Sequence, residues 1–72
     1  MLEKKELTFV VFILDALGQH WNMTTPEVYD ILNWTGILDD YIIRCYDVLH
    51  TLGKEYLVED ITEFVREKWI EV

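Results

Sequence analysis

Cysteine, histidine, proline and glycine are all scarce in this 72-residue chain. Cys45 is the only cysteine, so no disulfide can form within the chain, and a lone thiol suits a reducing compartment. With only His20 and His50 beside it, Cys45 completes no usual structural zinc site. The glycines are too far apart to build a phosphate-binding loop. We therefore expect neither a disulfide nor a metal or other cofactor.

Basic residues are also few: six stand against 14 acidic residues, which gives a net charge of −8. Nucleic-acid binding depends on Lys and Arg facing phosphates, and the chain has no basic stripe to supply them. Arg44 is the only base between Thr24 and Gly53, so a helix-turn-helix in this region would lack a basic recognition helix. An acidic surface favours a basic partner and keeps an apolar protein soluble.

No apolar run approaches the roughly 20 residues that a membrane-spanning helix needs. Two lysines before the apolar residues 7–14 imitate the beginning of a secretory signal. Two neighbouring glutamates dilute this positive flank, and Asp15 ends the apolar stretch after about two helical turns. We therefore expect a cytoplasmic protein without a membrane span.

Hydrophobic residues, in contrast, make up 51% of the chain and aromatic residues 14%. The length leaves room for one domain, residues 1–72. Chains of this size bury only about 60% of their unfolded surface and usually need a staple or a partner. Because the chain offers no staple, we expect a protein partner, either a second copy in a homodimer or another protein with a basic surface.

Hydrophobic spacing and capping residues predict an all-α fold, a compact bundle of four helices. The first helix is expected from about Glu3 to His20, with apolar residues on two faces, so that it lies centrally or is shared with a partner. The stretch Thr24 to Glu27 begins the second helix, with Thr24 or Thr25 as the cap. Gly36 is expected to end it in a left-handed conformation.

The third helix is expected to begin at Asp39 or Asp40 and to end before Gly53. Its inner face follows from apolar residues spaced by four and three: Leu38, Ile42, Cys45, Leu49 and Leu52. Cys45 in this position is a small buried hydrophobe rather than a nucleophile. Residues 54–58 fit either a turn of helix or an extended joint. The fourth helix is expected from about Glu59 to Trp69, with Ile61, Phe64, Val65 and Trp69 inward.

A candidate interaction surface combines the second apolar face of the first helix with the tryptophans. Tryptophan often anchors interfaces, although each could equally close the edge of a small core. The residues of this surface are Phe9, Phe12, Ile13, Ala16, Trp21, Trp34 and Trp69.

A candidate polar cluster surrounds the end of the third helix. Asp47 and His50 are three residues apart, so the carboxylate could orient the imidazole for proton transfer or metal binding. Alternatively, His50 and Thr51 satisfy terminal carbonyls and the later acids cap the fourth helix. No nucleophile or full ligand set completes the group, so we expect no catalytic residue. The members are Asp47, His50, Thr51, Glu55, Glu59 and Asp60.

The string from Tyr46 to Thr51, followed by Gly53, Glu55-Tyr56 and the residues 58–61, resembles the small bacterial family known as domain of unknown function 3791. The similarity extends back through residues 36–38 and into residues 9–12, and the chain departs from it most at residues 19–22. The resemblance implies no catalytic residues. It implies gene neighbours that resemble ADP-ribosyltransferase toxins, and hence an antitoxin or immunity role.

These observations lead to one functional expectation and one alternative from a different class. We expect a non-catalytic protein-interaction module that neutralises a partner, such as a toxin, by covering its surface. The alternative is a small metal-dependent or histidine-carboxylate enzyme centred on His50. A helix-turn-helix that binds nucleic acid is a further alternative, disfavoured by the charge.

Overall fold

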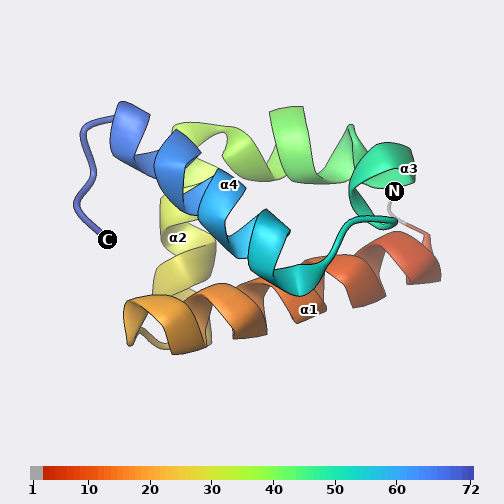
Figure 1. Cartoon of the computed structure of the whole chain (residues 1–72), viewed down its shortest axis with the longest axis horizontal. Coiled ribbons are helices and arrows are strands. Elements are labelled where there is room, and N and C mark those ends of the chain that lie inside the picture. Colours follow the sequence, from red (N-terminus) through yellow and green to blue (C-terminus); the bar gives the residue numbers. More distant parts are fainter. Residues whose placement is uncertain (1–2) are drawn as a thin grey trace.

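The computed structural model describes residues 3–72, and in these residues all regular structure is helical. The elements are α1 (Lys4–Trp21), α2 (Thr25–Thr35), the π-helical segment η1 (Leu38–Ile43), α3 (Tyr46–Leu49) and α4 (Lys54–Glu67). α1 and α4 lie side by side, α2 packs against one end of this pair, and η1 leads back to α3 (Figure 1). The predicted all-α fold is confirmed.

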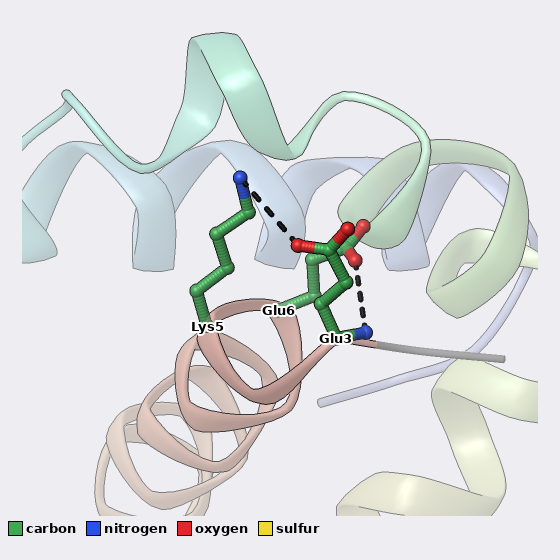
Figure 2. A network of polar contacts seen from close by, with 3 residues as sticks. All are labelled: Glu3, Lys5 and Glu6. Atoms are coloured by element: carbon green, nitrogen blue, oxygen red, sulfur yellow. Dashed lines mark hydrogen bonds and ion pairs between the residues drawn. The ribbon is translucent and has the colours of Figure 1, made fainter.

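α1 begins with a small polar network. The Glu3 backbone N–H donates to Glu6 Oε1 over 3.1 Å, and Lys5 Nζ lies 3.7 Å from Glu3 Oε2 (Figure 2). Both carboxylates lie near the positive end of the helix dipole, which favours negative charge. The helix ends where Asn22 adopts a left-handed conformation, with φ 57°, and its N–H donates to the Gly18 carbonyl. The predicted helix from Glu3 to His20 agrees within one residue at each end.

The core is centred on the contact between α1 and α4. Both helices place a stripe of aliphatic residues, spaced at three and four, in this contact. The stripe of α1 consists of Val10, Ile13, Leu14 and Leu17, and that of α4 of Leu57, Val58, Ile61 and Val65. α1 is thus central, as expected, although only one broad stripe of it is buried.

A buried hydrogen bond crosses the same contact. The Trp21 indole N–H donates to the Thr62 hydroxyl over 2.9 Å, joining the last residue of α1 to the middle of α4. Thr62 is only 5% exposed, and an unpaired polar group at this depth would be unfavourable. The bond therefore fixes which turn of α4 faces the end of α1.

α2 begins and ends as the sequence predicts. Thr24 is its N-cap: its hydroxyl accepts from the Glu27 N–H, while its own N–H donates to Glu27 Oε1 over 3.1 Å. Gly36 ends the helix with φ 81°, a left-handed conformation that glycine adopts without a Cβ clash. Val28 and Leu32 are fully buried beneath the helix.

The prediction of one continuous third helix is wrong. The segment divides into η1, a turn at residues 44–45 and the four-residue α3. The predicted inner face is nevertheless largely confirmed: Leu38, Ile42 and Leu49 are buried, and the half-buried Cys45 packs against the core. Leu52, the last residue of the predicted face, is 36% exposed.

The fourth helix begins earlier than predicted, because residues 54–58 form its first turns. Gly53 precedes it in an extended conformation, with φ −71°, so it starts α4 and does not terminate the helix before it. Glu59 and Asp60 consequently lie inside α4 and cannot cap its beginning. Trp69, expected on the inner face, lies beyond the end of the helix and is 95% exposed.

Replacing Thr62 by Val should lower the free energy of unfolding by about 1–3 kcal/mol, because the buried Trp21 indole N–H loses its acceptor. Equilibrium denaturation in urea measures the change. Thr62→Ser, which keeps the hydroxyl, should cost less, and Thr8→Val on the exposed face of α1 serves as a surface control. Equal stability of the Val and Ser variants would contradict the role of the hydrogen bond.

The cap of α2 should make stability depend on acid. Hydrogen bonds from the Thr24 backbone N–H, and then from its hydroxyl, lower the pKa of Glu27 from its usual 4.5. A carboxylate with a lowered folded pKa stabilises the fold above its unfolded pKa and loses this effect as the pH falls through the folded value. The stability advantage over Glu27→Gln should therefore be full at neutral pH and shrink below about pH 4.5. Thermal unfolding across this range measures it, and a constant difference would refute the prediction.

Candidate interaction surface

The tryptophans fall into two groups. Trp21 is only 8% exposed and is held by its hydrogen bond to Thr62, whereas Trp34 is 81% and Trp69 95% exposed. Trp34 lies near the end of α2, and Trp69 follows the end of α4. Two of the tryptophans of the candidate surface are therefore available to a partner, and the third belongs to the core.

The second apolar face predicted for α1 is likewise divided. Ile13 and Ala16 are buried against the other helices, so their assignment to an interaction surface is wrong, as it is for Trp21. Phe9 is half-buried, with its ring edge-on to Tyr46 at a centroid distance of 5.3 Å. Phe12 remains 43% exposed. Ile13 and Ala16 lie beside the buried stripe of α1 and are covered by the neighbouring helices. Phe12 lies further around the helix and is not covered.

The outer face of α1 is apolar in its first half. Leu7 and Val11, one turn apart, are 53% and 56% exposed, and Phe12 lies about 100° further around the helix, beyond Thr8. In the sequence, Leu7 and Val11 follow the same spacing of three and four as the buried Val10, Leu14 and Leu17. Only the position of the packed helices distinguishes them. We refer to Leu7, Val11 and Phe12 as the α1 outer face.

A second exposed region lies where α2 and α4 end. The junction after α2 and the last turn of α4 lie at the same end of the molecule (Figure 1), where they enclose a shallow hollow. Thr35, Gly36 and Ile37 contribute from the junction, and Phe64 and Lys68 from α4. In the chain, Trp34 directly precedes Thr35 and Trp69 directly follows Lys68. We call this region, with the residues 69–72, the C-terminal corner.

The candidate polar cluster is not assembled into one site. The His50 ring stacks on Tyr46 at 4.6 Å, and its Nδ1 lies 2.8 Å from the Tyr46 carbonyl oxygen. The Thr51 hydroxyl donates to the Val48 carbonyl over 2.7 Å. Both side chains thus satisfy carbonyls at the end of α3, as the structural alternative predicted. In residues 3–72 no group of three or more His, Cys, Asp or Glu side chains is arranged to hold a metal ion.

The acids of the cluster have different neighbours. Glu55 and Glu59 line a hollow of about 330 Å³ between α1 and α4, opposite His20 and beside Lys54. Asp60 instead accepts a hydrogen bond from the Tyr41 hydroxyl, which joins η1 to α4. Neither arrangement can be predicted from the sequence, because the partners are far apart in the chain and lie on different helices, so no local spacing relates them.

The Tyr41 contact changes the titration of the phenol. Burial, and then the hydrogen bond to Asp60, raise the pKa of Tyr41 above its ordinary value of 10.0. The ring also packs against Phe64, with the centroids 5.3 Å apart. A phenol held neutral in this way serves as a structural donor between two helices and not as a base.

The surface charge is mostly uncompensated. The chain carries 14 acidic residues, yet the one ion pair within residues 3–72 joins Lys5 to Glu3. On α4, Asp60, Glu63 and Glu67 line a shallow hollow together with Phe64. An exposed negative field of this kind attracts basic partners and repels acidic ones.

Comparison with known proteins agrees with the resemblance seen in the sequence. A family model described as "Protein of unknown function (DUF3791)" matches residues 8–68. No curated protein and no solved structure matches the chain. Among the helices within residues 3–72, none is both long enough and apolar enough to cross a membrane.

Replacing Tyr41 by Phe should lower the free energy of unfolding by about 1–2 kcal/mol at neutral pH, because the hydrogen bond to Asp60 is lost. A group with a raised folded pKa stabilises the fold below its unfolded pKa and loses this effect as the pH rises. The advantage over Tyr41→Phe should therefore shrink above about pH 10. Denaturation at neutral and alkaline pH measures it, with Tyr29→Phe on exposed α2 as the control. A difference that is independent of pH would contradict it.

Proposed function

Because this chain belongs to the DUF3791 family, whose description names no activity, we propose from its surface that it is a non-catalytic protein-interaction module. The observation that carries the proposal is the exposure of large apolar side chains around a core that is already closed. Within residues 3–72, sixteen buried hydrophobic residues form one core cluster. Nine large hydrophobic residues of the described chain remain exposed, including Trp34 and Trp69.

The size of the exposed side chains supports contact with a protein. Isolated exposed aliphatic residues are common on soluble proteins, but tryptophans exposed to this degree are not, because each ring leaves a large apolar area in water. Tryptophan is also the residue that most often contributes binding energy at protein interfaces. The α1 outer face and the C-terminal corner are therefore the two proposed contact regions.

Charge indicates which partner fits. With a net charge of −8 and little internal ion pairing, the surface favours a protein with a basic contact face. In this proposal the chain is an antitoxin- or immunity-type partner that neutralises a toxin by covering its surface, and it acts in the cytoplasm. Its lone half-buried thiol, Cys45, suits that reducing compartment.

Self-association belongs to the same proposal. The α1 outer face presents Leu7 and Val11 on one side of a regular helix and Phe12 on the other side of Thr8, and such a helix can pair with its own copy across a two-fold axis. This part of α1 carries fewer acids than the end of α4, so two copies can approach there with less repulsion.

Replacing Phe12 by Glu should abolish assembly through the α1 outer face while the monomer stays folded, because the ring is 43% exposed and a carboxylate there would be desolvated in an interface. Sedimentation should show a decrease in mass relative to the unchanged chain, with a loss of at most about 1 kcal/mol in stability. Asn33→Glu, at an exposed position of α2 away from this surface, is the control for charge alone. The same mass for both variants and the unchanged chain would count against this surface.

The wider function is tested by co-purification. The tagged chain, expressed in its native host, should retain a protein with a basic contact surface, and identification of that protein should reveal a toxin. Retention of no protein at all, or a turnover of substrate that depends on His50, would refute the proposed module.

A further inference from the structure

We infer that the C-terminal corner docks a basic segment of the partner protein, with Trp69 as its apolar anchor. The inference rests on the proposed function and specifies the contact region and the chemistry of the partner. It depends on three features of the corner: the backbone conformation of Trp69, the hollow beside it and the surrounding charge.

The backbone at Trp69 is unfavourable for its side chain. Trp69 has φ 67°, the left-handed conformation that follows many helix ends and is usually occupied by glycine. A bulky residue there is strained, because its Cβ approaches the neighbouring carbonyl oxygen. The indole gains no burial in return, since the residue is 95% exposed. A residue that fits neither helix termination nor the core is best explained by a contact outside the chain.

The tail after Trp69 is held in place and forms a hollow beside the indole. Arg66 Nη2 donates to the Val72 carbonyl oxygen over 3.1 Å, which turns the last residues back toward α4. Ile70 and Val72 pack against the edge of the core. Arg66, Glu71 and these two apolar residues line the hollow with Trp69. An apolar side chain of a partner could enter this hollow without a large rearrangement of the tail.

The surrounding charge selects the occupant. Glu63, Glu67 and Asp60 line the adjacent side of α4 around Phe64, and Glu71 stands at the hollow itself. Arg66, which is bonded to the tail, and Lys68, 5.9 Å from the centre of the Phe64 ring, also lie here, but the four acids outnumber these two bases. A second copy of the chain carries the same net charge of −8 and would be repelled from an acidic corner. A segment that carries Lys or Arg beside an apolar residue is the complementary occupant.

Trp34 provides an internal comparison. Trp34 is almost as exposed as Trp69 but lies on the regular backbone of α2. Both side chains are therefore exposed, whereas only Trp69 has a strained backbone. Trp21, buried and bonded to Thr62, supplies a third indole that should not respond to a ligand.

The first measurement separates strain from exposure. Trp69→Gly should raise the midpoint of thermal unfolding by roughly 4–8 °C, because glycine adopts the left-handed conformation without strain. Trp34→Ala should change the midpoint little. A midpoint for Trp69→Gly that is equal to or below that of the unchanged chain would overturn the claim that Trp69 is retained at the expense of stability.

The second measurement tests the occupant. The intact chain is used to select from a display library of random peptides, and bound peptides are then titrated while the three indole N–H resonances are followed by NMR. Selected peptides should be positively charged with an apolar residue, and they should shift the Trp69 indole while the Trp21 indole stays unchanged. Trp69→Gly should weaken binding roughly tenfold or more, and Trp34→Ala should weaken it less.

Other results would reject the inference and identify what fails. No selected peptide, selected peptides without basic residues, or binding that Trp69→Gly leaves intact would each overturn docking at this corner. Loss of self-association in Trp69→Gly would instead identify a second copy as the occupant and refute the basic segment. If the Trp69→Gly variant still co-purifies with the partner protein, the chain is an interaction module but does not bind its partner through this corner.

Discussion

The packing of α1 against α4, fixed by the hydrogen bond from the Trp21 indole to the Thr62 hydroxyl, is the constraint on which the other elements depend. The apolar stripes of the two helices could slide along each other at similar cost, since aliphatic contacts are not directional. One buried donor with one buried acceptor removes this freedom, because any other register would leave both without a partner. α2 then covers one end of the pair, and η1 and α3 return along the remaining side.

This arrangement determines which apolar residues are left for a partner. α1 has more apolar residues than one packed face can bury, so Leu7, Val11 and Phe12 remain on the side away from the core. The other exposed region arises at a helix end. α4 stops at Glu67, and the left-handed turn that follows directs Trp69 outward. Both regions support the proposal of an interaction module, and the acidic residues around the second favour a basic partner.

Much of the fold could be predicted because its signals are local. The Thr24 cap and the left-handed Gly36 mark the two ends of α2, and each signal involves only neighbouring residues. The apolar period of α1 is long and regular. The third helix was predicted with most of its inner face correct but as one continuous element, because a π-helical segment has the composition of a helix and the sequence does not show where the helix divides. The beginning of α4 was predicted too late because residues 54–58 fit either a helix or an extended joint, and in the structure they follow Gly53 as the first turns of α4.

The sequence alone determined the class of the fold, the first two helices, the acidic surface and the family, since each depends on composition, on short spacings or on a contiguous string of residues. The tertiary structure decided which of several similar apolar residues are buried, how the polar cluster disperses and where Tyr41 meets Asp60. Tryptophan illustrates the reason most clearly. Trp21 and Trp69 are the same residue type next to helix ends, and only the position of a second helix, with its hydroxyl at Thr62, places one in the core and leaves the other in water.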